Sequence, residues 1–131
     1  MAKAGRSDAP KLADEISFPL YAASKEIIRR YKPYLEELDL TYTQYLAMIA
    51  LWEHGELAVN EMGKLLYLDS GTLTPLLKKL EAKGYIVRTR SAVDERRVVI
   101  TLTETGKRLR GNAGKVPAAV KDELGFDAED E

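Results

Sequence analysis

The sequence predicts a mainly helical domain that carries one small β-hairpin near its C-terminal third. Apolar residues recur at three- and four-residue spacing through most of residues 12–83, which is the period of amphipathic helices. Two short segments rich in β-branched residues, 85–90 and 97–102, then alternate as an antiparallel strand pair does. The chain of 131 residues is long enough for a single domain (1–131) with its own core.

The composition excludes several classes of protein. There is no cysteine, so disulfide and thiol chemistry are absent. The longest unbroken apolar run, LAMIALW at 46–52, is too short to cross a membrane. The opening MAKAGRSDAP has no apolar stretch of a signal peptide and is expected to be a mobile tail. We therefore expect a cytoplasmic protein with no membrane association.

The first long helix is predicted over residues 12–32. Pro19 should mark a kink or a delayed start, because proline removes a backbone donor, and Pro33 should end the regular run. The residues that share one face of this helix are Leu20, Ser24, Ile27, Ile28 and Tyr31. This amphipathic pattern predicts a helix that packs along one side.

Two shorter helices follow. The first spans 43–54, with Leu46, Ile49 and Ala50 inward, and Gly55 is its C-terminal stop. The second spans 60–66 and carries Met62, Leu65 and Leu66. Their short spacing predicts neighbouring helices in one bundle.

The segment LDSGTLTPLLKKLEAKG predicts a fourth helix with two different faces. Its apolar face is Leu73, Leu76, Leu77 and Leu80, and Gly84 closes it as a left-handed cap. The opposite face carries Gly71, Thr72, Pro75, Lys78, Lys79 and Ala82, which suits close approach to an anionic surface. Either Asp69 or Ser70 is the N-cap, or the helix begins later with Thr74 as cap and Pro75 at its first position.

The strand pair at 85–90 and 97–102 is joined by the tip SAVDER. Two short helices, a tight turn and a β-hairpin together predict a winged helix-turn-helix. Arg96 at the tip of such a wing can enter a DNA minor groove, where the potential is most negative. Asp94 can hold that guanidinium by a bidentate pair. The alternative is an ordinary hairpin with surface ion pairs.

The charge is unevenly distributed along the chain. The net charge is −1, yet residues 78–110 hold 10 Lys/Arg against 4 Asp/Glu, between acidic flanks. A local positive field can bind phosphate even when the whole chain is near neutral. A solvated charged face is the alternative reading of this block.

An enzyme is the competing class, and the sequence argues against it. The single histidine, His54, has one acidic neighbour in Glu56, which is typical of a surface pair at a helix end. Motifs for a serine nucleophile, a phosphate loop and a dinucleotide are absent. We expect no catalytic residues, no metal and no cofactor.

Asp94, Arg96, Leu102 and Thr103 form a D-x-R pattern followed by LT, which resembles the signature of the MarR family of regulators. The stretches FPLYAASKEIIRRYKP, LTYTQYLAMIALWEH and YLDSGTLTPLLKKLEAKGY resemble its organic hydroperoxide resistance branch, from about residue 16 to 105. The resemblance implies a homodimeric, peroxide-sensing repressor that binds a palindromic operator in double-stranded DNA. It implies DNA contacts at Asp69, Ser70, Thr72, Lys79, Asp94 and Arg96, while Lys78 joins them from the helix pattern. The same resemblance favours a helix that starts near Asp69, with Pro75 inside it.

Two departures from this branch affect its sensing site and its dimer. The matching stretch SFPLY places Ser17 where the branch has a reactive cysteine, and the two sensing tyrosines match Tyr31 and Tyr42. A hydroxyl cannot follow the oxidation chemistry of a thiolate, so Ser17 is either a loss of the sensor or simply the cap of a helix beginning at Phe18. The chain also ends after a glycine-rich, acidic stretch in which only 103–110 is expected to be helical. The dimer then rests on the first helix plus a short C-terminal part, or the chain is truncated.

Three regions follow: helices for dimerisation and sensing (12–54), the winged helix-turn-helix (55–103) and a C-terminal segment (104–131). The effector is an organic hydroperoxide or, if the clustered tyrosines line a pocket, a small aromatic molecule. A winged helix used for protein–protein contact remains the third class. Phosphate contacts would distinguish DNA binding from it by a steep salt dependence.

Overall fold

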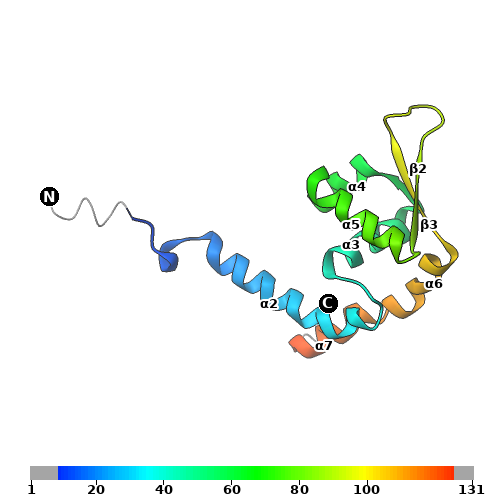
Figure 1. Ribbon diagram of the computed structural model, residues 1–131. Coiled ribbons are helices and arrows are strands. Elements are labelled where there is room, and N and C mark those ends of the chain that lie inside the picture. Colours follow the sequence, from blue (N-terminus) through cyan, green and yellow to red (C-terminus); the bar gives the residue numbers. More distant parts are fainter. Residues whose placement is uncertain (1–8, 126–131) are drawn as a thin grey trace.

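A computed structural model describes residues 9–125 of the chain, so the predicted tail at 1–10 lies almost entirely outside the described residues. The elements follow one another along the chain (Figure 1) in the order η1 (Leu12–Asp14), α2 (Ser17–Glu36), α3 (Tyr42–His54), β1 (Glu56–Ala58), α4 (Val59–Leu66), α5 (Ser70–Ala82), β2 (Ile86–Arg90), β3 (Val98–Leu102), α6 (Glu104–Ala113) and α7 (Val116–Leu124). The mainly helical class with a β-hairpin is confirmed.

The predicted hairpin is part of a three-stranded sheet. All pairs are antiparallel and the strand order is β1-β3-β2, so β3 is central. Ile100 of β3 lies opposite Leu57 on one side and Arg88 on the other. The sequence reading missed β1, because a strand of three residues has no measurable alternation of its own.

The core lies where α3 and α5 meet each other and the sheet. Met48, Leu51, Leu77, Leu80 and Ile100 are all fully buried there, each at 1 % exposure or less. Burying one such side chain contributes about 1.5–3 kcal/mol before the entropy cost of ordering it. This core fixes the positions of α5 and of the hairpin relative to each other.

Both ends of α3 are fixed by residues next to them in the chain. The Thr41 hydroxyl accepts from the Gln44 backbone N–H, and the Gln44 side chain accepts in return from the Thr41 N–H, so α3 begins with a capping box. Gly55 ends the same helix at a φ of +83°, a region that favours glycine. The predicted stop at Gly55 is confirmed.

The first long helix differs from its predicted range. Residues 12–14 form a separate 3-10 turn, and α2 runs from Ser17 past Pro33 to Glu36, so the predicted end at Pro33 is wrong. Pro33 is exposed, so the backbone carbonyl that loses its partner there can reach water. Pro19 falls in the first turn of α2, where backbone N–H groups have no helical acceptor.

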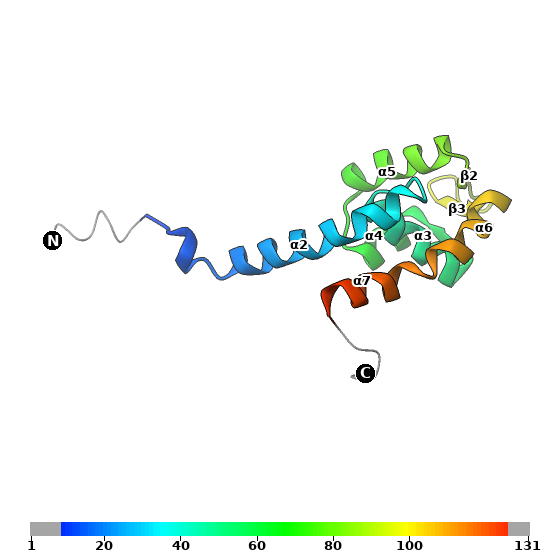
Figure 2. The same cartoon turned by 90° about the horizontal axis from the view of Figure 1, so that it is seen from below.

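The N-terminal half of α2 projects away from the rest of the molecule (Figures 1 and 2). Its apolar side chains therefore have little of this chain to pack against. The exposed large apolar side chains of this part of the molecule are Leu12, Ile16, Phe18, Leu20, Tyr21 and Ile27. This strip, the α2 strip, is the largest departure from the usual burial of apolar side chains.

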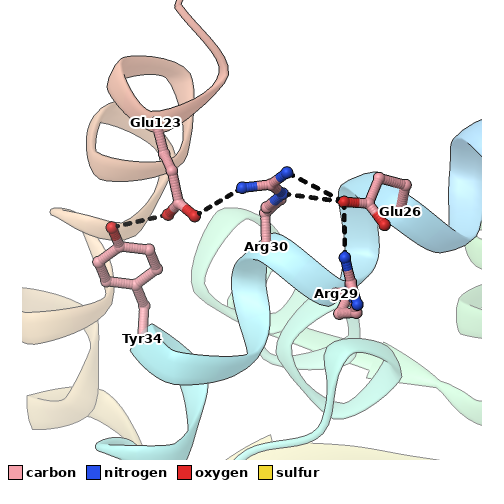
Figure 3. A network of polar contacts seen from close by, with 5 residues as sticks. All are labelled: Glu26, Arg29, Arg30, Tyr34 and Glu123. Atoms are coloured by element: carbon pink, nitrogen blue, oxygen red, sulfur yellow. Dashed lines mark hydrogen bonds and ion pairs between the residues drawn. The ribbon is translucent and has the colours of Figure 1, made fainter.

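A second C-terminal helix, α7, lies beside the C-terminal half of α2 (Figures 1 and 2), so the prediction that only 103–110 is helical is wrong. Val116 and Val120 are buried against the core. At its far end, Glu123 accepts hydrogen bonds from Arg30 at 3.2 Å and from the Tyr34 hydroxyl at 3.0 Å (Figure 3). These contacts hold a helix that its own sequence only weakly favours.

Candidate nucleic-acid interface

Helix α5 begins at a well-defined cap. Asp69 is its N-cap, and the Asp69 Oδ1 accepts from the Thr72 backbone N–H at 2.8 Å. This bond lowers the pKa of Asp69 below its ordinary value and keeps the carboxylate ionised. The predicted start near Asp69 is confirmed, and the alternative start at Thr74 is wrong because the exposed Pro75 is tolerated inside the helix.

The two faces of α5 are the predicted ones. Its four leucines are buried, so the helix has one orientation on the core. The residues predicted for the outer face are all exposed: Gly71, Thr72, Pro75, Lys78, Lys79 and Ala82. Small side chains near the start and two lysines about two turns later leave this face open to a large partner.

A groove runs between α4, the start of α5 and the base of the hairpin. Its volume is about 1260 Å³. It brings together four of the predicted residues, since Asp69 and Ser70 line it from α5, and Asp94 and Arg96 line it from the hairpin tip. Thr72, Lys78 and Lys79 do not line the groove and lie on the adjoining outer face of α5.

The hairpin tip is ordered by Asp94. Its Oδ1 accepts from the Arg96 backbone N–H at 3.0 Å and lies 3.5 Å from the Arg96 Nε, so the predicted bidentate guanidinium pair is wrong. The Arg96 side chain is 94 % exposed. The tip is closed instead through the backbone, including a bond from the Arg90 guanidinium to the Glu95 carbonyl at 2.8 Å. Arg96 is thus presented without strong side-chain partners.

Arg97 has a different role from Arg96. Its guanidinium binds the Glu61 carboxylate at 2.8 Å, and the same oxygen accepts from the Ala58 backbone N–H at 2.8 Å. Glu61 therefore caps α4 and joins it to the base of the hairpin. The sequence reading missed Glu61, although its position three residues after Ala58 is typical of a capping glutamate.

The structure places the predicted sensing residues in two separate locations. Tyr31 and Tyr42 form an edge-on pair with ring centroids 5.2 Å apart, and the buried Tyr45 completes the cluster. Burial raises the pKa of Tyr42, so its phenol stays protonated as a donor. Ser17 lies on the same helix as Tyr31 but about 21 Å along its axis, at the usual 1.5 Å per residue.

Ser17 is not the cap of α2. It is the first helical residue, Ile16 holds the capping position without a side-chain bond, and the Ser17 hydroxyl donates to Glu15 at 3.2 Å. The capping interpretation is therefore wrong. Within one chain, Ser17 is exposed and distant from both tyrosines.

The groove also contains residues that the sequence reading did not single out. Asn60, Lys64 and Tyr67 line it from α4 and from the turn that follows. Lys64 and Asn60 lie on the polar face of an amphipathic helix, which the periodicity could have identified. Nothing in the sequence predicted that Tyr67 is exposed, because an aromatic residue between two apolar positions is usually buried.

Comparison with known proteins places this arrangement in a family. The family model described as transcriptional regulator SarA/Rot matches residues 29–111. The chain belongs to this family. The regulator is 51 % identical to the organic hydroperoxide resistance transcriptional regulator of Bacillus subtilis (strain 168) over 113 residues, which are 86 % of this chain and 77 % of that protein. It is 46 % identical to the HTH-type transcriptional regulator SarZ of Staphylococcus aureus (strain USA300), with 86 % and 76 % covered.

Among solved structures, the regulator is similar to reduced AbfR bound to DNA. The TM-score is 0.76 and the identity is 34 %, over 90 % of this chain and 79 % of that chain. The resemblance to the organic hydroperoxide resistance branch of the MarR family is confirmed, and the winged helix-turn-helix with it. The named relatives are transcriptional regulators, which places this chain in a class that is not enzymatic.

Two further findings concern the described residues alone. No helix between residues 9 and 125 is long and apolar enough to cross a membrane. Within the same range, no three His, Asp or Glu side chains are grouped so that they could hold a metal ion.

Proposed function

We propose that this protein is a DNA-binding repressor of the organic hydroperoxide resistance type. The observation that carries the proposal is the presentation of α5, whose exposed Thr72, Lys78 and Lys79 adjoin a groove that ends at the wing residue Arg96. In this arrangement α5 enters the major groove and the wing reaches the adjacent minor groove. Asp69 and Ser70 face the groove from the start of α5, and Asp94 faces it from the wing tip. A cytoplasmic location follows from chromosomal DNA as partner.

The same proposal assigns the dimer to the α2 strip. Two copies that pair these exposed apolar side chains across a two-fold axis would remove them from water. Residues 12–54 then form the dimer and sensing region, 55–103 bind DNA, and 104–131 form the C-terminal segment. Within that segment α7 (Val116–Leu124) packs against α2. Two symmetry-related copies of α5 predict a palindromic operator with half-sites about one helical turn apart.

Lys79→Ala tests DNA binding directly. A mobility-shift titration on the protein's own upstream DNA should show a loss of ~1–3 kcal/mol if Lys79 contacts a base. If Lys79 contacts a phosphate, the salt slope should fall by about 0.9 for each protomer, hence by about 1.8 for the dimer. Lys107→Ala is the matched control, because Lys107 belongs to the same basic block but lies on α6 and is paired with Glu104. A protein that does not shift this duplex even at low salt, where phosphate contacts are strongest, would point to a winged helix used for protein contact.

The sensing site supports a specific expectation about Ser17. A dimer that places Ser17 of one protomer near Tyr31 and Tyr42 of the other would build the site that a single chain cannot form. Because a serine hydroxyl is not oxidised by hydroperoxides as a thiolate is, the protein should stay on its operator when treated with cumene hydroperoxide. Ser17→Cys should restore release by peroxide.

The outcomes of this experiment separate two parts of the proposal. Release of the serine protein at low peroxide dose would refute the assignment of Ser17 as the lost sensor. Retention of the Ser17→Cys protein on DNA, after its sulfenic acid is confirmed, would refute the tyrosine pocket. The relevant control is Ser24→Cys, a thiol on the same helix away from the predicted position.

A small aromatic effector is the second candidate, and one cavity favours it. This cavity of about 430 Å³ lies between α2 and the start of α3. Its lining includes apolar and aromatic side chains, three cations and two carboxylates: Ile28, Leu35, Tyr42, Arg29, Lys32, Lys83, Glu36 and Asp39. Apolar walls beside cations suit an aromatic carboxylate. Calorimetric titration with benzoate, repeated on Lys32→Ala, tests this candidate, and no heat of binding at millimolar benzoate would remove it.

A further inference from the structure

Tyr67 stands out at the end of α4 by its exposure and its backbone. Its side chain is 94 % exposed, and its φ of 57° and ψ of 40° lie in the left-handed region. Its phenol makes no hydrogen bond to any of the residues that the structure describes. Tyr67 therefore contributes neither core packing nor a side-chain bond to this fold.

The left-handed backbone makes tyrosine a costly residue at this position. An L side chain in this region is strained, and glycine is the residue that helix ends normally use there. This chain does so after α3 and α7, and again just beyond α5, where Gly55, Gly125 and Gly84 each have a φ of +83°. Asp39 also has a positive φ, but aspartate tolerates it more readily. A bulky aromatic side chain kept in a strained and fully exposed position indicates a role for the side chain itself.

The surroundings of Tyr67 indicate what it meets. It lines the groove between α4, α5 and the wing, and it lies two residues before Asp69, the N-cap of α5. Lys64 lines the same groove one turn earlier on α4 and is exposed. When a helix enters the major groove of DNA by its N-terminal end, the residues just before the helix lie at the rim of the DNA groove. The phosphates of the DNA backbone line this rim.

We infer that Tyr67 is a DNA-backbone contact, in which its phenol donates a hydrogen bond to a phosphate oxygen beside the major groove occupied by α5. This inference rests on the proposed function. It adds one uncharged hydrogen-bond donor to the lysine and arginine side chains that are proposed to contact DNA. Because the phenol carries no charge, it displaces no counterion and its loss leaves the salt slope unchanged. Because the backbone of Tyr67 is strained, replacing this residue by glycine is expected to lower the affinity for DNA and to raise the stability of the fold.

The experiment measures Kd for the upstream duplex by fluorescence anisotropy across a salt series, and Tm in the absence of DNA. Tyr67→Phe should keep the Tm and weaken binding about 10- to 150-fold per contact, the range for a lost hydrogen bond to a charged group. Tyr67→Gly should weaken binding at least as much and raise the Tm by about 3 °C, because it relieves the backbone strain. Both variants should keep the wild-type salt slope.

Asp39→Gly is the matched control, since it relieves a positive φ far from the groove. It should leave Kd unchanged whatever it does to the Tm. Wild-type Kd values for both Tyr67→Phe and Tyr67→Gly would overturn the inference. A loss with glycine but none with phenylalanine would overturn the hydrogen bond and leave a contact by the ring. A wild-type protein that binds no duplex at all would refute the proposed function, and the inference with it.

Discussion

Replacing Arg96 by alanine is expected to weaken DNA binding without disturbing the wing. The Arg96 guanidinium is 94 % exposed and has one long contact, 3.5 Å from Nε to the Asp94 carboxylate. The bond that orders the tip runs from the Arg96 backbone N–H to the same carboxylate at 3.0 Å, and alanine keeps it. The substitution therefore removes a charge while the turn stays closed.

The magnitude follows from counterion release. Each phosphate neutralised on B-DNA contributes about 0.9 to the slope of log K against log salt. A dimer presents two wings, so Arg96→Ala should lower the slope by about 1.8 if each arginine neutralises one phosphate equivalent in the minor groove. Arg96→Lys should keep most of the slope, because the charge remains, but lose affinity, because lysine lacks the planar guanidinium.

Arg97 and Asp94 supply the comparisons. Arg97→Ala should change the slope less, because Arg97 is already bound to Glu61 at 2.8 Å. Asp94→Ala should reproduce part of the Arg96 effect, because it removes the carboxylate that closes the tip. The variants are compared by fluorescence anisotropy on one duplex between about 50 and 200 mM salt. Over this range of salt, proteins with several phosphate contacts lose orders of magnitude in affinity.

The result that refutes this reasoning is a larger loss of slope for Arg97→Ala than for Arg96→Ala. In that case the Glu61 pair would break on binding, and Arg97 would be the wing residue that meets DNA. An unchanged slope for Arg96→Ala would remove Arg96 from the interface altogether.

Three further predictions concern stability and the position of α5. Gly106→Ala should destabilise the protein by about 1–3 kcal/mol in a denaturant titration, because a Cβ there would run into the Tyr85 carbonyl oxygen. Glu123→Ala should release the end of α7 and increase amide exchange in that helix, because it removes both acceptors of the bonds from Arg30 and Tyr34. Unchanged protection would mean that the buried valines suffice. Asp69 has a lowered pKa because of its bond to Thr72, so its stabilising effect is present above the unfolded pKa and is lost as pH falls through the folded value. Thermal melts between pH 6 and 3 on the protein and on Asp69→Asn should therefore converge at the acid end, and parallel curves would contradict this.

The parts of the fold that sequence could predict are those fixed by local chemistry. The four leucines of α5 and the left-handed glycine at 84 could be predicted because spacing and capping act within one helix. The N-cap was left open between Asp69, Ser70 and Thr74, and only the resemblance to the family favoured Asp69. The exposed face with Lys78 and Lys79 follows from the same periodicity. Candidate residues on α5 were therefore predicted in the right place.

The parts that sequence could not predict depend on contacts between distant segments. Residues 116–124 contain a proline and lie among glycines, yet they are helical because Val120 is buried and Glu123 binds α2. The helix through Pro33 persists because the proline faces solvent. The position of Tyr67 in the groove depends on the turn between two packed helices, and no residue pattern within the turn reports it.

The pairing of β1 with β3 has a consequence for how the chain is made. Leu57 lies opposite Ile100, and the helices α4 and α5 lie in the loop of chain that this pairing closes. The β2–β3 hairpin can form by itself within about 1–10 μs, whereas closing the longer loop costs more chain entropy. During synthesis, β1 waits without a partner until residue 100 has left the ribosome. A nascent chain that is cut or stalled before that point holds every residue of α5 but lacks the strand that locks its surroundings.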